Sequence, residues 1–350
     1  MQAKRPGWSE LERGVSPRRY QVARCTLWLV VWIAMIAAVV AADDALELRL
    51  ASDRWPPFTG EAGTQRVAIE LVHTALDHAG IRATMTIVDW KDVENGIRNA
   101  TYDGSAAMWR SEEREQDLLF SEPYLENRLV LVGRKGSDVT AARMSDLAGK
   151  RVAVVRRYAY GDEIEKAVGV LFVGGRNDQD DLNKLLAGEV EYMLVDELVA
   201  RYLATNQPEE ATAKLEIGAT PLARRTLHLA IRRDLPEAEG IVQAFNREIR
   251  NMLTDGTYAE ILQIGWIRVD VDGDGLDELV PLSDSVDFPP AGSVYDVFAT
   301  EPESPPEKQR IFIQGSIFEG WDAVPDRYKG PAGPNEVTLK GGTTLFTLQF

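Results

Sequence analysis

The feature that most constrains the fold is a regular alternation of apolar strand and helix patterns in the first third of the chain. Residues 46–51 are expected to form a buried first strand, and 81–90 alternate apolar and polar side chains as a second strand. Between them, apolar residues recur at helical spacing over 67–79, and Gly80 marks the helix end. A short helix is expected over 91–99. Strands that alternate with helices indicate parallel α/β construction.

Length and charge set further bounds. At 350 residues the chain exceeds the usual size of a single core, so two lobes or domains are expected. It carries 39 lysines and arginines against 55 aspartates and glutamates, a formal charge of −16. Such an acidic surface repels nucleic acid, which is therefore not an expected partner. A local basic pocket can still bind an anion, because charges are screened beyond about 8 Å.

The segment before the first strand has the organisation of a signal peptide. Basic residues are concentrated in 1–25, and an uncharged apolar run covers 26–42. Val40 and Ala42 occupy the two positions that signal peptidase reads before a cleavage site. We therefore expect 1–42 to be a signal peptide and the mature protein to be periplasmic. The alternative is an uncleaved membrane anchor, since the apolar run lies at the lower limit for spanning a bilayer.

The stretch from Asp103 to Tyr124 holds the strongest candidate for a binding site. At its centre is Arg114, whose guanidinium presents donors in a planar fork that matches a carboxylate. The surrounding glutamates allow a plainer interpretation, a solvated and charged helix face. The letters SEER at 111–114 and FSEPY at 120–124 resemble the T-x-x-R and F-S-x-P-Y signature of type II periplasmic solute-binding proteins for polar amino acids.

The resemblance covers about residues 45–268, since TDGTYAEI at 254–261 is similar to the closing D-G-T-Y-x-x-I of that family. It implies an α/β, two-lobed periplasmic-binding-protein-like fold of type II. Lobe 1 would contain 43–133 and 225–268, and lobe 2 would contain 134–224. Two crossing strands would join the lobes.

The resemblance also implies roles for polar groups in a cleft between the lobes. Arg114 would bind an anionic group of a small polar solute, with Ser111 and the backbone near Ala107 assisting. Asp196, which follows a strand expected over 188–195, would bind a cationic group. The alternative is that Asp196 only caps the next helix.

Aromatic side chains are expected on the walls of the same cleft. Trp55 and Phe58 lie in a loop stiffened by two prolines, and Tyr158 and Tyr160 follow a strand expected over 151–155. The alternative for each pair is structural: the first would pack a turn and the second would pack the lobes together.

Two departures from the family pattern bear on the solute. Trp109 and Arg110 stand where the amino-acid binders place small hydroxyl and apolar residues, and Arg157-Tyr158-Ala159 replaces their Gly-Ser-Thr. These changes leave open a bulkier or more acidic solute in place of a standard α-amino acid.

The residues beyond 268 lie outside the resemblance. Acidic side chains within 269–283 fit the spacing of a short FG-GAP-like calcium loop: Asp270, Asp272, Asp274 and Glu278. The alternative is an acidic turn without a metal. Structural calcium is the one cofactor considered, and none is required. Residues 284–308 are rich in Pro, Ser and Glu and indicate a linker. Residues 309–350 indicate a small C-terminal extension with a few strands and no assigned role.

Three functions fit these features. The leading one is a solute-binding protein, not an enzyme, that serves ABC-type uptake through a permease. The same fold also hosts a cyclohexadienyl dehydratase, for which Asp53, Glu113 and Glu197 are the candidate acids or bases. The third is a sensory module whose tail docks a membrane sensor or other partner.

Overall fold

The computed structural model describes residues 47–206, 213–263, 265–282, 287, 289, 294–298 and 309–330. The expected signal peptide and its apolar run lie outside the described residues, as do most of the expected linker and residues 331–350. Within the described part, no helix combines the length and the apolar character needed to cross a membrane.

Lobe 1 is built on strands β1 (Glu47–Ser52), β2 (Arg82–Ile87) and β3 (Gly104–Trp109), which pair in parallel in the order β2-β1-β3. Every residue of β3 is buried, and its first four residues, 104–107, have small side chains or none. Helix α2 (Val67–His78) buries the apolar face predicted from the sequence, and α3 (Trp90–Arg98) follows β2. The strand–helix alternation predicted for this region is confirmed.

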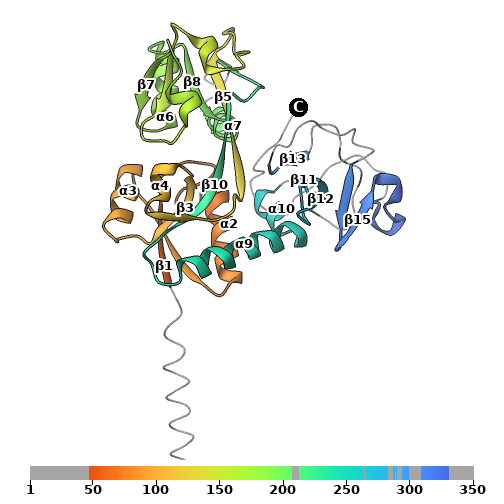
Figure 1. Ribbon diagram of the computed structural model, residues 1–350. Coiled ribbons are helices and arrows are strands. Elements are labelled where there is room, and N and C mark those ends of the chain that lie inside the picture. The colour runs from red at the N-terminus through yellow and green to blue at the C-terminus, as the bar shows by residue number, and fades with distance from the viewer. Residues whose placement is uncertain are drawn as a thin grey trace, which may run out of the picture. The chain divides into compact units, whose positions relative to one another are not determined.

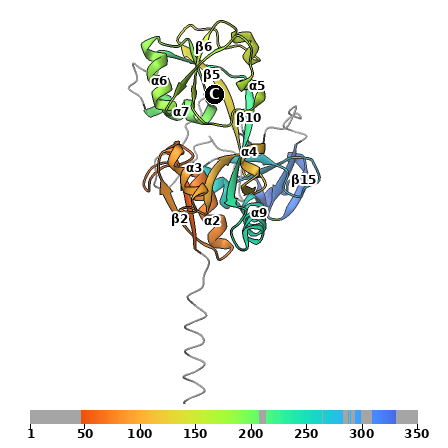
Figure 2. The ribbon, with the colours of Figure 1, turned by 60° about the vertical axis from the view of Figure 1, so that its left-hand side comes forward.

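Two ten-residue strands connect the lobes, β5 (Leu125–Arg134) and β10 (Ala223–Arg232). The first half of β5 pairs with β10, and its second half pairs with β8 (Tyr192–Asp196) of lobe 2. Strand β10 also pairs with β3 and with β4 (Leu118–Phe120). Figures 1 and 2 both show β5 and β10 passing from the lobe with α2 to the lobe with α6.

Lobe 2 repeats the parallel plan on a smaller scale. Strand β6 (Arg151–Val155) pairs in parallel with β7 (Leu171–Gly175) and β8, and β9 (Leu215–Ile217) pairs with β5. Its helical elements are η1 (Met144–Leu147), α5 (Asp162–Glu165), α6 (Asp178–Ala187) and α7 (Glu197–Asn206). The short helix α4 (Glu112–Glu115) belongs to lobe 1, where it lies between β3 and β4. Helix α6 begins at the side-chain cap of Asn177 and ends at Gly188 in the left-handed conformation.

The chain returns through α9 (Ala238–Asp255) and α10 (Thr257–Leu262) to a separate five-stranded sheet. Its strands lie in the order β13-β11-β12-β14-β15. Their bounds are β11 (Trp266–Val269), β12 (Glu278–Pro281), β13 (Val294–Asp296), β14 (Arg310–Ile313) and β15 (Ser316–Glu319), with short turns η3 (Trp321–Ala323) and η4 (Asp326–Tyr328) after them. Figure 1 shows β15 in blue at this end.

This sheet corrects two boundaries predicted from the sequence. The expected linker 284–308 contains β13, which pairs in parallel with β11, so it contributes a strand to the sheet. The end of lobe 1 expected at 268 falls inside β11, and the acidic loop connects β11 to β12. The fold class itself is confirmed: a two-lobed α/β fold with a small β-rich C-terminal sheet.

Candidate functional site

Five of the nine predicted binding residues line a small cavity between the two lobes. It measures about 20 Å³. Its lining comes from the loop after β1, the start of α3, β3, α4, the loop after β6, and β10: Asp53, Trp55, Trp90, Ala107, Trp109, Arg114, Tyr158, Ala159 and Leu227. The structure thus brings Trp55, Ala107, Trp109, Arg114 and Tyr158 together, as the sequence analysis expected of a shared cleft.

Aromatic rings form the walls of this cavity. The Trp109 ring lies 5.7 Å from the Trp55 ring and 5.4 Å from the Tyr158 ring, each in an edge-on arrangement. The indole nitrogen of Trp109 donates a hydrogen bond of 2.7 Å to Asn127 Oδ1, which fixes the orientation of the ring. Trp109 is therefore a fixed wall and not a freely rotating surface side chain.

Arg114 already has partners in this structure. Its Nη1 donates to the carbonyl oxygen of Trp109 at 2.7 Å, and its Nη2 lies 3.7 Å from Glu94 Oε1. The guanidinium stacks on Trp90, with Cζ 5.0 Å from the ring centroid. Burial lowers the pKa of Arg114, and the charges of Glu94, Glu113 and Asp53 act in the opposite direction. A solute carboxylate would compete with Glu94 for this guanidinium.

Trp90 and Glu94 are functional candidates that the sequence analysis missed. They lie four residues apart on α3, and Trp90 Nε1 donates to Glu94 Oε1 at 3.0 Å. The other oxygen of Glu94 accepts from Arg157 Nε of lobe 2 at 2.9 Å. The available signal was weak: the i, i+4 spacing places both side chains on one helix face, but nothing in it identifies Arg114 and Arg157 as their partners.

Asp53 joins the two lobes at the other side of the cavity. Its Oδ2 accepts a hydrogen bond of 2.9 Å from the hydroxyl of Tyr158. Burial raises the pKa of Asp53 to about 6, although the hydrogen bond from Tyr158 and the charge of Arg114 oppose the change. Asp53 therefore holds a proton below about pH 6, and above that pH its carboxylate can accept a hydrogen bond from a cationic group.

This carboxyl group makes the stability of the fold depend on pH. Because the pKa of about 6 exceeds the ordinary value of 3.8, the folded protein retains a proton that the unfolded chain has released. The resulting stabilisation is complete at low pH and is lost as the pH rises through 6. Between pH 5 and pH 8 the wild-type protein should therefore lose about 1 kcal/mol of unfolding free energy through this group. Asp53→Asn should lack this part of the pH dependence.

Urea denaturation at the two pH values measures this change. Asp234→Asn is the control, because Asp234 is exposed and its pKa is lowered by Arg232, so it titrates below the window. An unaltered pH dependence in Asp53→Asn would contradict the assignment.

Three predicted site residues lie near the cavity without lining it. Phe58 is fully buried behind Trp55, with the ring centroids 4.6 Å apart. The Tyr160 hydroxyl accepts from the backbone nitrogen of Val155 at 3.0 Å. Ser111 caps α4 by accepting from the backbone nitrogen of Arg114. Phe58 and Tyr160 therefore support the aromatic walls of the cavity, and Ser111 supports the helix that carries Arg114.

Asp196 takes the role of a helix cap. Its Oδ1 accepts from the backbone nitrogens of Leu198 and Val199 at the start of α7, at 2.7 and 3.2 Å. Its Oδ2 accepts from the side chain of Asn127 and the backbone nitrogen of Arg128, each at 3.1 Å. Burial raises the pKa of Asp196 to about 7. The carboxyl group lines neither described cavity, so the geometry favours the cap over the expected contact with a solute cation.

A second and larger cavity of about 1380 Å³ shares Arg114, Tyr158 and Ala159 with the small one. Ser111 and Glu113 lie on its lining, together with several arginines and acidic residues from both lobes. Glu197, the remaining candidate acid, instead pairs with Arg201 along α7 at 2.7 Å. The large cavity is therefore an open, mixed-charge approach to the small aromatic one.

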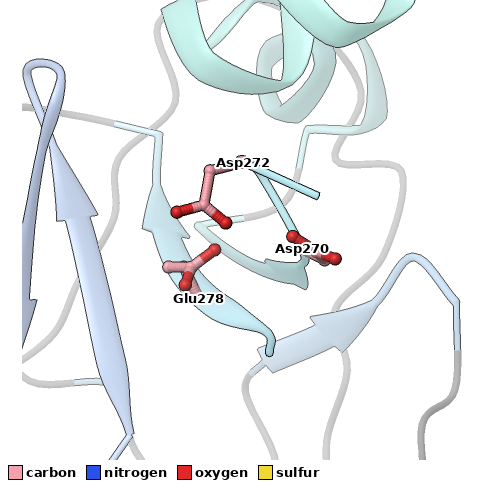
Figure 3. A group of neighbouring side chains, drawn as sticks. All are labelled: Asp270, Asp272 and Glu278. Carbon is pink, nitrogen blue, oxygen red and sulfur yellow. The ribbon is translucent and has the colours of Figure 1, made fainter. Parts of the chain in front are cut away.

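The acidic loop between β11 and β12 gathers part of the predicted metal set. Oxygen atoms of Asp270, Asp272 and Glu278 lie within 4.8 Å of one another. Figure 3 shows these three side chains. Asp274 stands outside this group and accepts from Arg310 Nη1 at 2.8 Å. The same nitrogen lies 2.9 Å from the fully buried Glu278 Oε1. Arg310 thus supplies positive charge that the sequence pattern alone assigned to calcium.

Solved structures with the same fold support the description of two lobes joined by two crossing strands. An ancestral arginine-binding protein bound to arginine superimposes with a TM-score of 0.54 and 24% identity, covering 62% of this chain and 96% of that one. The fold is the two-lobed fold of periplasmic binding proteins. Residues 48–267 match the bacterial extracellular solute-binding proteins, family 3, and the chain belongs to that family.

Curated relatives include a binding protein and an enzyme. The chain is 25% identical over 224 residues to the L-cystine-binding protein TcyJ of Escherichia coli (strain K12), covering 62% of this chain and 80% of that protein. It is 27% identical over 206 residues to membrane-bound lytic murein transglycosylase F of Pseudomonas fluorescens (strain Pf-5). That match covers 53% of this chain but only 41% of the enzyme, so much of the enzyme has no counterpart in it.

Proposed function

We propose that this protein captures a small polar, amino-acid-like solute in the cleft between its lobes. The observation that carries the proposal is the convergence of Arg114, Trp55, Trp109 and Tyr158 on one cavity, in a chain of this family. Arg114 would exchange Glu94 for a carboxylate of the solute, and the indole rings would cover its apolar part. The binding of cystine and arginine by the relatives named above supports an amino-acid-like solute.

We infer further that the protein is exported and delivers its solute to an ABC permease, with a membrane sensor as the alternative recipient. The sequence pattern of 1–42 supports export. Cell fractionation tests the location. A periplasmic protein without residues 1–42 is the expected product, and retention in the membrane fraction would favour the anchor instead.

A thermal-shift screen against amino acids, organic acids, polyamines and sugars tests solute capture. A solute at 100 times its Kd should stabilise the folded state by about 2.7 kcal/mol. A raised melting temperature with one solute class supports the proposal, and an unchanged melting temperature across the panel contradicts it. Prephenate and arogenate belong in the panel, because their conversion to an aromatic product would favour the dehydratase alternative.

The acidic loop supports a second proposal, that it binds structural Ca²⁺. The donor set fits a hard cation, since it consists of carboxylate oxygens. The buried Glu278 Oε1 forms an ion pair with Arg310 but accepts no hydrogen bond. Asp270, Asp272 and Glu278 would hold the ion in exchange for the guanidinium of Arg310.

Replacement of Arg310 by alanine tests this exchange. The variant leaves the buried Glu278 carboxylate without its ion-pair partner, so we expect a loss of about 2 kcal/mol in unfolding free energy. Millimolar Ca²⁺ should restore most of that loss, because it supplies the missing charge. Arg310→Lys is the matched control. It keeps a positive charge beside Glu278, so less calcium should be needed to restore its stability. If calcium leaves the melting temperature of Arg310→Ala unchanged, the loop is an acidic turn without a metal.

A further inference from the structure

We propose that Tyr158 is a built-in occupant of the solute cleft, a side chain of lobe 2 that fills the space the solute must take. The inference rests on the proposed function, because it concerns the same cavity. It assigns Tyr158 a role opposite to that of a contact residue: its phenol competes with the solute.

The surroundings of the phenol ring are those of a bound aromatic ligand. Rings from both lobes encircle it, with centroid distances of 5.9 Å to Trp55, 6.2 Å to Trp90, 5.4 Å to Trp109 and 6.1 Å to Tyr160. Trp55, Trp90 and Trp109 belong to lobe 1, whereas Tyr158 follows β6 of lobe 2. The ring therefore projects out of its own lobe into a pocket made by the other.

The polar end of Tyr158 also finds a partner across the cleft. Its hydroxyl donates to Asp53 Oδ2 at 2.9 Å, and both side chains are half-buried. A partly buried hydrogen bond to a carboxylate stabilises the contact between the lobes without any solute. Tyr158 thus occupies the cavity with both an apolar ring and a hydrogen-bond donor.

The space left over is too small for a solute. The remaining cavity of about 20 Å³ accommodates roughly one water molecule. An amino acid can bind between these walls only after the phenol leaves. The displaced phenol can move into the large cavity, which Tyr158 and Ala159 also line and which measures about 1380 Å³.

The residue before Tyr158 holds the loop in this position. Arg157 has a φ of 70°, a left-handed conformation that is unfavourable for a side chain of this kind. Its guanidinium donates to Glu94 at 2.9 Å, and its carbonyl oxygen accepts from Arg114 Nη2 at 3.4 Å. These contacts couple the loop to Arg114, so displacement of Tyr158 by a solute would also release the clamp.

The decisive experiment compares the Kd of a solute for Tyr158→Ala with its Kd for the wild-type protein. If the phenol competes with the solute, its removal increases the fraction of binding-competent protein, and Kd for a solute found in the screen falls by about tenfold or more. Tyr158→Phe keeps the ring but loses the bond to Asp53, and its Kd should fall by a smaller factor. Weaker or unchanged binding in both variants would overturn the proposal and leave Tyr158 as an ordinary wall.

A probe that needs no known solute gives a second reading. p-Cresol has the shape of the deleted side chain, so it should raise the melting temperature of Tyr158→Ala by about 2–4 °C at several times its Kd. Wild type and Tyr158→Phe, in which the ring still fills the space, should show no rise. Equal shifts in all three proteins, or none in a Tyr158→Ala protein with native circular dichroism, would overturn the occupant.

The two tests separate this inference from the proposed function. Suppose that p-cresol stabilises Tyr158→Ala, but no solute of the panel changes the melting temperature of wild type or variant. This result would support the proposal that Tyr158 fills the cleft, and it would contradict solute capture. A solute that binds wild type tightly and Tyr158→Ala weakly would have the opposite meaning.

Discussion

Replacement of Arg114 by alanine is expected to abolish solute binding, with Kd rising by about a hundredfold or more. The guanidinium is half of a charge-assisted pair in a largely buried site, and an unpaired carboxylate of the solute would have no other cation on the lining of the small cavity. The fold should survive, because Glu94 retains its bond to Arg157. Isothermal titration calorimetry with the solute found by the thermal-shift screen measures the loss.

Arg110→Ala is the matched control for this substitution. Arg110 lies four residues earlier, is exposed, and lines the large cavity but not the small one. We expect its affinity to stay within about threefold of wild type, as for a solvent-exposed charge. Comparable affinity in Arg114→Ala would show that the clamp is assigned to the wrong residue.

The largest effect on stability is expected from Gly104→Ala in β3. A Cβ atom at this position would lie 2.0 Å from the carbonyl oxygen of Ala230 and 3.1 Å from the Cα of Ile231 in the neighbouring strand β10. Backbone atoms cannot rotate away as a flexible side chain can, so the pairing of β3 with β10 must shift. We expect a loss of about 3 kcal/mol or more in unfolding free energy, measured by urea denaturation.

Gly240→Ala is expected to change the unfolding free energy in the opposite direction. Gly240 lies in α9, and a Cβ atom there would have no neighbour within 4 Å. We expect this substitution to stabilise the fold by about 0.5–1 kcal/mol, because alanine has the higher helix propensity. A Gly104→Ala protein as stable as Gly240→Ala would mean that β3 and β10 do not approach as closely as described.

The sequence was sufficient for the lobes because their elements carry strong local patterns. The helical period of α2, the alternation at the start of β1 and the apolar run of β6 can each be recognised without knowledge of the rest of the chain. The cavity was predictable in part for a different reason: the SEER and FSEPY letters resemble a family pattern, and Arg114 and Trp109 follow from their positions in it.

What could not be predicted depends on partners distant in the chain. Asp196 ends a strand and precedes a helix, a position suited to both a ligand and a cap, and only the approach of Asn127 and two backbone amides distinguishes them. Strand β13 is three residues long, too short for any periodicity, and is defined by pairing with β11. The contact of Arg310 with Glu278 joins residues on two neighbouring strands whose pairing the sequence does not reveal.

A crystal structure of the protein with its solute tests the central claim most directly. The account predicts solute density against Arg114 and between Trp55 and Trp109, with the phenol of Tyr158 displaced from Asp53. Solute density at any other place in the molecule, or in this cavity beside an undisplaced Tyr158, would contradict it.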